Sequence, residues 1–117
     1  MSNRVDGRKL GRKTGPRLAL YKNLTVAILR YEQVKTTEAR AKEVRGRVER
    51  MITLAKDGSL SARRRVVAEM PDEPLVIDKL FKEIAPRYAD RTSGYTRLIR
   101  IGIRNGDAAP IVQIELV

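Results

Sequence analysis

Arginine and lysine are the residues of this sequence whose type and spacing could do chemistry, and that chemistry is the binding of a polyanion. The chain has 25 Lys and Arg against 14 Asp and Glu, a formal net charge of +11. A compact domain with so much like charge usually has a negatively charged partner. Within residues 1–15 a single acid, Asp6, stands beside five cations: Arg4, Arg8, Lys9, Arg12 and Lys13.

A second group of cations lies toward the end of the chain. Arg87 and Arg91 fall in residues 87–94, a polar stretch that we expect to be a loop. Arginine pairs bidentately with phosphate, and a tyrosine such as Tyr88 can stack on an unpaired base. The segment that follows contributes Arg97, Arg100 and Arg104 with few acids nearby. Arginines on an edge strand can serve solubility alone, but their number here favours contact with RNA.

The same composition argues against catalysis. The chain has no cysteine and no histidine, so it lacks thiolate ligands and the commonest general acid or base near neutral pH. Asp72, Glu73 and Asp78 are the only acids that suggest a two-metal site. Helix capping and the helix dipole already account for Asp72 and Glu73. We therefore expect no enzyme activity and no cofactor.

The remaining features of the composition place the chain among cytoplasmic binding proteins. No apolar run approaches the roughly 20 residues that span a bilayer, and the basic N-terminus lacks the apolar core of a signal peptide. A length of 117 residues suits one domain. Residues 1–15 contain too few apolar side chains to offset the entropy of ordering. We expect them to form a basic arm that is ordered only on RNA.

Four helices are predicted between residues 16 and 86. Apolar residues recur every three or four positions after Pro16, which suits the start of a helix that ends near Tyr31. Thr37 is a candidate N-cap for a helix that Gly58 ends. A short helix with Arg63-Arg64-Arg65 covers residues 60–70, capped by Ser59 or Ser61, and another follows Pro74 and is ended by Pro86.

A short strand and a hairpin complete the expected fold. Residues 32–36 are too few for a helix and predict a strand. Asn105-Gly106 between two β-branched runs predicts a tight hairpin turn over residues 94–117. Because side chains alternate along a strand, Val112, Ile114 and Leu116 share one face. On the other strand a common face is predicted for Tyr95, Arg97, Ile99, Ile101 and Ile103.

These elements predict an α+β fold in which about four helices pack on a small sheet, made of the C-terminal hairpin and one short strand. Residues 16–117 form a single domain, and residues 1–15 an extended arm. Alternatives to RNA binding are a DNA-binding or nucleoid-associated protein, since the arm and Arg63-Arg64-Arg65 would suit DNA, and an adaptor for acidic proteins. A membrane surface is less favoured because the chain has few aromatic residues.

Several motifs in order resemble one known family. They include Gly7-Arg8-Lys9-Leu10-Gly11-Arg12, Arg17-Leu18-Ala19-Leu20-Tyr21-Lys22-Asn23-Leu24, Val34-Lys35-Thr36-Thr37, Ala85-Pro86-Arg87-Tyr88, Gly94-Tyr95-Thr96-Arg97 and Gly106-Asp107-Ala108-Ala109-Pro110. Together they resemble the bacterial large-subunit ribosomal protein L-seventeen family, over essentially the whole chain. The resemblance implies a cytoplasmic structural protein of the ribosome that binds large-subunit ribosomal RNA beside other ribosomal proteins. It implies a position around the polypeptide exit tunnel, and neither enzyme activity nor a cofactor.

The resemblance also implies particular RNA contacts. Matching the motifs position by position gives four expected contacts in addition to the cations named above: Arg17, Lys22, Lys35 and Tyr95. Two departures concern the arm. The family usually begins Met-Arg-His, where this chain has Met1-Ser2-Asn3-Arg4, and it usually has a histidine where Pro16 stands. Contacts made by those histidines therefore have no counterpart here.

Overall fold

The computed structural model describes the backbone of residues 14–117 and the side chains from Leu18 onward. The predicted arm therefore lies almost wholly outside the described residues. In chain order the elements are α1 (Thr14–Tyr31), β1 (Gln33–Thr37), α2 (Glu38–Asp57), α3 (Leu60–Glu69), α4 (Pro74–Lys79), the π-helix η1 (Leu80–Ile84), α5 (Ala85–Arg87), β2 (Thr96–Ile103) and β3 (Pro110–Leu116).

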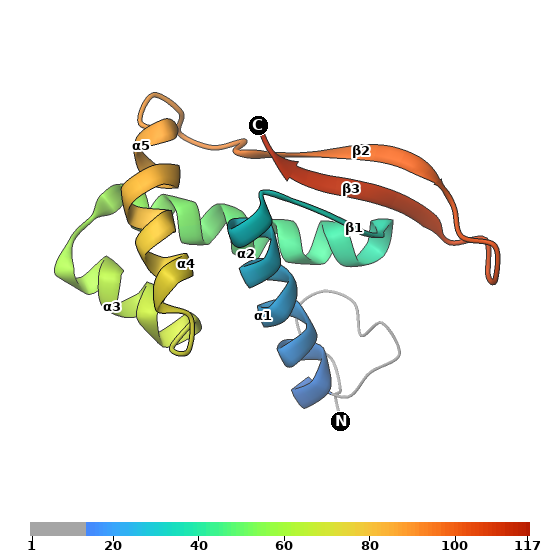
Figure 1. The fold of residues 1–117 in the computed structure, drawn as a ribbon, viewed down its shortest axis with the longest axis horizontal. Helices are drawn as coiled ribbons and strands as arrows, with labels where there is room; N and C mark the ends of the chain where they lie inside the picture. Colours follow the sequence, from blue (N-terminus) through green and yellow to red (C-terminus); the bar gives the residue numbers. More distant parts are fainter. Residues whose placement is uncertain (1–13) are drawn as a thin grey trace.

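The helices pack on one face of a three-stranded antiparallel sheet, so the predicted α+β architecture is confirmed. Figure 1 shows α1 and α2 beneath the sheet and the β2–β3 hairpin extending beyond the helices. The core forms where α2 meets the sheet. Val44, Val48 and Ile52 of α2 are fully buried, as is Ile114 of β3. Burial of these aliphatic side chains, at about 25 cal/mol per Å² of apolar surface, holds the two layers together.

Local chemistry sets the ends of α2 and α3 as predicted. The hydroxyl of Thr37 accepts a hydrogen bond from the backbone N–H of Arg40, at the start of α2. Gly58 ends that helix at a φ of 70°, in the left-handed region, and its N–H donates to the carbonyl of Leu54. Ser59 then caps α3 through the N–H of Ala62 at 3.1 Å. These contacts satisfy backbone groups that a helix end leaves unpaired.

The prediction that Pro86 ends a helix is wrong. The helix that begins at Pro74 continues through η1 and α5 to Arg87. In η1 the N–H of Ala85 donates to the carbonyl of Leu80, five residues earlier. A proline inside an α-helix clashes with the carbonyl four residues before it. The wider π-turn comes directly before Pro86 and accounts for its place inside the helix.

The sheet has the strand order β1-β3-β2, so the short strand pairs with the last strand and β2 lies at an edge. Leu98 is opposite Ile114, and this inner face is the one that the helices cover. The helices do not cover the other face of the sheet, which carries Ile99 and is called the open face below. The alternation expected for β2 also fails near its end, because a bulge interrupts the register between Arg100 and Gly102.

The hairpin turn also differs from the prediction. A tight Asn105-Gly106 turn was expected, but β2 ends at Ile103 and β3 begins at Pro110, which leaves a six-residue loop. The residue with a positive φ is Ala108, at 59°. The N–H of Ala108 donates to the carbonyl of Arg104, and the carboxylate of Asp107 accepts from the N–H of Ala109. Side-chain contacts of Asp107 therefore override the local preference of Asn-Gly.

Candidate nucleic-acid interface

The open face of the sheet brings together two of the predicted contact residues. Lys35 of β1 pairs in register with Gln113, and Arg97 of β2 pairs with Glu115, so both cations lie on the outer face, on either side of β3. Two strand spacings separate β1 from β2, which is about 10 Å. Both side chains are exposed. The open face therefore presents two cations to solvent, with Glu115 between them.

The three hairpin arginines all have an acidic partner, which the sequence reasoning did not foresee. Arg97 pairs with Glu115 at 2.6 Å, Arg100 with Glu38 at 3.2 Å and Arg104 with Asp107 at 2.6 Å. The hydrogen bond from Arg104 is the main cause that lowers the pKa of Asp107 to about 2. The expectation of arginines with almost no acids nearby was therefore wrong. The side chains of Arg97 and Arg100 nevertheless remain 60% and 64% exposed.

Tyr95 does not lie where a nucleic-acid contact requires it. Its side chain is 0% exposed and packs against Tyr88, with ring centroids 5.2 Å apart. Its hydroxyl donates to the carbonyl of Thr92 at 2.9 Å and accepts from Lys56 at 3.0 Å. Tyr88 is also buried, and its hydroxyl donates to the carbonyl of Val117. No ring face is open to a base, so we correct the expectation for both tyrosines and treat them as core residues.

The loop predicted over residues 87–94 runs from residue 88 to residue 95, between α5 and β2, and side chains of α2 bind it to the helices. The Glu49 carboxylate accepts hydrogen bonds from the N–H groups of Gly94 and Thr96, both at 3.0 Å. Arg45 donates to the carbonyl of Thr96, and the ammonium group of Lys56 donates to the carbonyl of Arg91. The exposed Arg91 side chain donates to the carbonyl of Gly94 at 3.1 Å. The loop therefore has a defined shape within this structure.

Glu32 connects four parts of the fold and holds Arg87. It lies just past α1 with a backbone φ of 67°, a conformation that residues other than glycine rarely adopt. Its carboxylate pairs with Arg87 at 2.5 Å and with Lys79 at 3.2 Å, and its carbonyl accepts from the N–H of Leu116. The hydrogen bond from Arg87 is the largest of several effects that lower the pKa of Glu32 to about 2. Arg87 is therefore a structural residue as well as a candidate contact.

A different set of cations has no acidic partner among residues 18–117. Lys22 and Lys35 belong to it, as predicted contacts. The sequence reasoning left Arg64 and Arg65 of α3 out of the interface, although both are exposed. For Arg64 the signal was available, since no acid stands three or four residues away on the helix. The full set is Lys22, Arg30, Lys35, Arg40, Arg45, Arg50, Lys56, Arg63, Arg64, Arg65, Lys82 and Arg91.

The other predicted contacts are positioned only in part. Arg17 falls within α1, but its side chain lies outside the described residues. The rest of the arm set also lies outside them: Arg4, Arg8, Lys9, Arg12 and Lys13.

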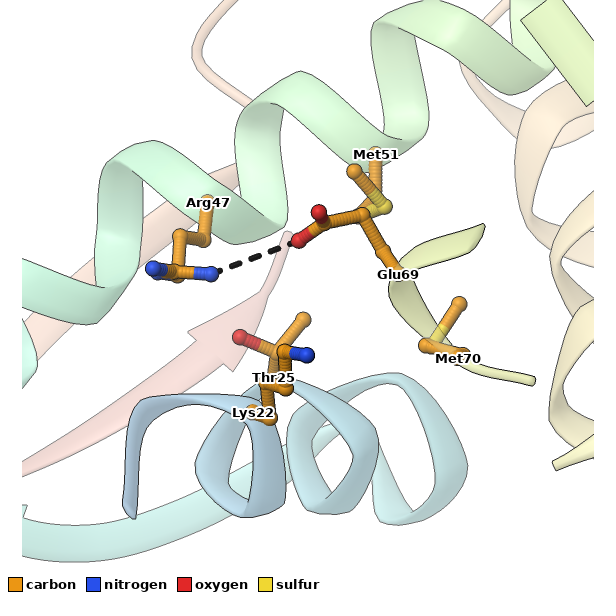
Figure 2. A pocket seen from close by; sticks show the side chains of 6 residues that line it. All are labelled: Lys22, Thr25, Arg47, Met51, Glu69 and Met70. Atoms are coloured by element: carbon orange, nitrogen blue, oxygen red, sulfur yellow. Dashed lines mark hydrogen bonds and ion pairs between the residues drawn. The ribbon is translucent and has the colours of Figure 1, made fainter. Parts of the chain in front are cut away.

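A small hollow between α1, α2 and α3 offers little chemistry. Figure 2 shows Arg47 of α2 and Glu69 of α3 joined across it, 3.3 Å apart, facing Lys22 and Thr25 of α1. Met51 and Met70 complete the lining. Because its only carboxylate is already paired with Arg47, the hollow offers no free carboxylate. In the part of the chain that is described, His, Cys, Asp and Glu form no group that could hold a metal, and none of its helices is long and apolar enough to cross a membrane.

The fold and its surfaces define a small, basic α+β domain with cations on an open sheet face. The family described as ribosomal protein L17 matches residues 20–117. A protein named large ribosomal subunit protein bL17 from Desulfitobacterium hafniense is 56% identical over 110 residues, covering 94% of this chain and 97% of its own length. The protein of that name from Dehalococcoides mccartyi is 44% identical over 117 residues, covering 100% and 99%.

The chain therefore belongs to the ribosomal protein L17 family, which confirms the resemblance inferred from its motifs. This family is not known to be enzymatic, in agreement with the expectation from the composition.

Proposed function

We propose that this protein is a structural constituent of the large subunit of cytoplasmic bacterial ribosomes, where it binds ribosomal RNA through lysine and arginine contacts to phosphate. The observation that carries the proposal is the family match across residues 20–117, with relatives named as large-subunit proteins over nearly their whole length. The net charge of +11 supplies the physical reason for a polyanionic partner.

The proposed interface has three parts. The first is the arm with its cations and Arg17. The second is the sheet, with Lys35 and Arg97 on its open face and Arg100 and Arg104 elsewhere along the β2–β3 hairpin. The third is Lys22 on α1 together with the predicted 87–94 loop, whose cations are Arg87 at the end of α5 and Arg91. Most contacts go to phosphate, because side chains read the deep major groove of RNA helices poorly. Specificity then comes from the folded shape of the RNA.

By the same resemblance we propose that the protein lies on the side of the subunit around the polypeptide exit tunnel, beside other ribosomal proteins. A density map of large subunits that contain this chain tests the position. Density for the chain on another side of the subunit would refute it.

The salt dependence of affinity tests the binding mechanism. Each neutralised phosphate releases counterions, so the logarithm of affinity falls linearly with the logarithm of salt concentration. We expect affinity for large-subunit ribosomal RNA to fall steeply between low and moderate salt, measured by filter binding. Duplex DNA at equal phosphate concentration should compete weakly. A flat salt dependence would contradict phosphate binding, and strong competition by DNA would favour a DNA-binding protein instead.

A matched pair of variants separates a specific contact from net charge. Lys35→Ala removes an exposed cation that has no acidic partner among the described residues, on the open sheet face. Lys42→Ala removes one positive charge on α2, where Lys42 stands 3.9 Å from Glu38. Lys35→Ala should weaken binding and lower the salt slope by about one. Equal effects from the two variants would show that only total charge matters.

A further inference from the structure

Tyr31, the last residue of α1, is an aromatic side chain that the core leaves in solvent. The chain has four Tyr, one Phe and no Trp. Tyr21, Tyr88 and Tyr95 are buried, and Phe81 is partly buried against the core. Tyr31 is 63% exposed, and its hydroxyl has no hydrogen-bond partner among the described residues. Packing inside the domain therefore does not account for this ring.

The preceding residue of α1 places a cation against the ring. The guanidinium carbon of Arg30 lies over the Tyr31 ring, 5.2 Å from its centroid. Arg30 is exposed and has no acidic partner among the described residues. A single exposed apolar side chain is ordinary on a protein surface. A ring beside an unpaired guanidinium group, however, combines a surface for stacking with a charge for phosphate, which is how proteins hold unpaired nucleotides.

The acid next to this pair is already neutralised. Glu32 follows Tyr31, and its carboxylate pairs with Arg87 at 2.5 Å and with Lys79 at 3.2 Å. The ammonium group of Lys79 also donates to the carbonyl of Arg30 at 2.7 Å. Three cations thus accompany one carboxylate at the end of α1. The charge of Arg30 is therefore not offset by its acidic neighbour and remains available for an anion.

The backbone holds the Tyr31 ring in a defined place. The N–H of Glu32 donates to the carbonyl of Ile28, a fully buried residue, at 2.8 Å. The carbonyl of Glu32 accepts from the N–H of Leu116 at 3.0 Å, which joins the end of α1 to the sheet. The backbone on either side of the ring is thus ordered by folding. Less conformational entropy then remains to be lost when a ligand stacks on the ring.

We propose that Tyr31 stacks on an unpaired base of large-subunit ribosomal RNA, with Arg30 on the adjoining phosphate. Bases inside an RNA helix already stack on their neighbours, so the ring takes a base from a loop, a bulge or an end. Every base has an aromatic face, so the contact selects an unpaired nucleotide at one place in the folded RNA rather than a particular sequence. The inference rests on the proposed function and adds a contact to a base to its phosphate contacts.

A protein segment is the other class of partner for an exposed ring. The centre of a protein interface contains several neighbouring apolar side chains and few charges. At the end of α1 the side chains beside Tyr31 are instead charged, and the one whose charge is unpaired is a cation. The site therefore favours a nucleotide, which supplies an aromatic face and a phosphate together.

Two substitutions at one position separate stacking from other effects of the side chain. The full-length chain and its variants are compared by filter binding to large-subunit ribosomal RNA, and their folding is checked by melting. Tyr31→Phe keeps the ring and should bind within about twofold of the wild type. Tyr31→Leu keeps an apolar side chain without a ring and should lower affinity about tenfold. No loss for leucine, or an equal loss for phenylalanine, would refute stacking.

Leu60→Ala is the matched control, because Leu60 on α3 is 65% exposed, close to the value for Tyr31. It should leave the affinity unchanged. A loss equal to that of Tyr31→Leu would show that any exposed apolar residue matters, and the proposal would fail.

Salt dependence distinguishes the roles of the two residues. Stacking releases no phosphate counterions, so Tyr31→Leu should lower affinity by the same factor at every salt concentration. Arg30→Gln should instead reduce the slope of the logarithm of affinity against the logarithm of salt concentration by about one. A changed slope for Tyr31→Leu would contradict stacking, and an unchanged slope for Arg30→Gln would contradict its phosphate contact.

Photo-crosslinking in intact large subunits identifies the partner. The photoreactive residue p-benzoylphenylalanine replaces Tyr31 in the full chain, and the joined nucleotide or peptide is identified by mass spectrometry after irradiation. We expect one nucleotide from an unpaired segment. If the unmodified chain is absent from large subunits, the proposed function fails and the inference fails with it. If the chain is present but position 31 joins a protein, a paired nucleotide or nothing, the stacking contact alone is refuted.

Discussion

Replacing Glu32 by glutamine tests whether one carboxylate ties the end of α1 to the helices and the sheet. Glutamine keeps the size of the side chain and the β-carbon, so the left-handed backbone at φ 67° costs the same in both proteins. What changes is the charge that Arg87 and Lys79 share, at 2.5 Å and 3.2 Å. The difference between the two proteins therefore measures these ion pairs alone.

The magnitude follows from the pKa of Glu32, which falls from 4.5 to about 2 in the folded protein. That difference corresponds to about 3 kcal/mol of interaction favouring the charged form. The side chain is 33% exposed, and solvent screening weakens pairs at such sites, so we halve the value to about 1.5 kcal/mol. For a domain of this size the loss lowers the melting temperature by about 5 °C.

The pH dependence gives a second, independent measure. Because the folded-state pKa lies below the unfolded value, the stabilisation is fully present above about pH 4.5 and is lost as the pH falls toward 2. Urea denaturation of the wild type and of Glu32→Gln should therefore differ most at neutral pH. The free energies of unfolding of the two proteins should approach each other as the pH falls from 4 toward 2.

Glu83→Gln is the matched control, because Glu83 is exposed on η1 and has no ion pair among the described residues. It should change the free energy of unfolding by less than about 0.5 kcal/mol. The reasoning is refuted if Glu32→Gln is no more destabilising than Glu83→Gln. It is also refuted if the difference between wild type and Glu32→Gln stays constant from pH 7 to pH 3.

Three further perturbations probe the core, a helix end and the arm. Tyr95→Phe removes hydroxyl contacts at 2.9 and 3.0 Å and should cost about 1–2 kcal/mol of stability, yet leave RNA affinity within about twofold because the ring is buried; a large loss of affinity would restore Tyr95 to the interface. Gly58→Ala should cost about 1 kcal/mol in urea denaturation, from a φ of 70° alone, since a β-carbon there meets no atom closer than 3.9 Å. Deletion of residues 1–15 should weaken RNA binding while calorimetry still shows one cooperative transition; loss of that transition would mean that the arm belongs to the core.

Features that depend on a few neighbouring residues were predictable from the sequence. The caps at Thr37, Gly58 and Ser59 are of this kind, because each requires only one side chain or one φ value next to a helix end. The short strand after α1 was also predictable, since residues 32–36 leave no room for a helix, and β1 runs from Gln33 to Thr37. Local propensity and tertiary structure agree at these positions.

Features that depend on distant residues were not predictable. Arg100 and Glu38 are 62 residues apart in sequence, and Arg87 and Glu32 are 55 apart. Alternation along the hairpin could not tell which face the helices cover, and the bulge at Arg100 changes the alternation itself. Tyr95 directly precedes the arginine-rich strand β2, yet its side chain is buried and packs against Tyr88. The expected contacts therefore included two core residues, Tyr88 from the loop and Tyr95 from the motif resemblance.

The ion pairs of the hairpin are compatible with a role in RNA binding, for a reason of geometry. A guanidinium group has five N–H donors in a fixed plane, and in Arg97 the Nε and one terminal nitrogen face Glu115. The other terminal nitrogen remains available, on a side chain that is 60% exposed. The acid also restricts the rotamers of the arginine, so less conformational entropy remains to be lost when a phosphate binds. Lys35 on the same face has no acidic partner among the described residues, so its charge is not neutralised, but its side chain keeps all the conformational entropy that binding would remove. Paired arginines thus favour defined geometry and free lysines favour net attraction, and the open sheet face combines both.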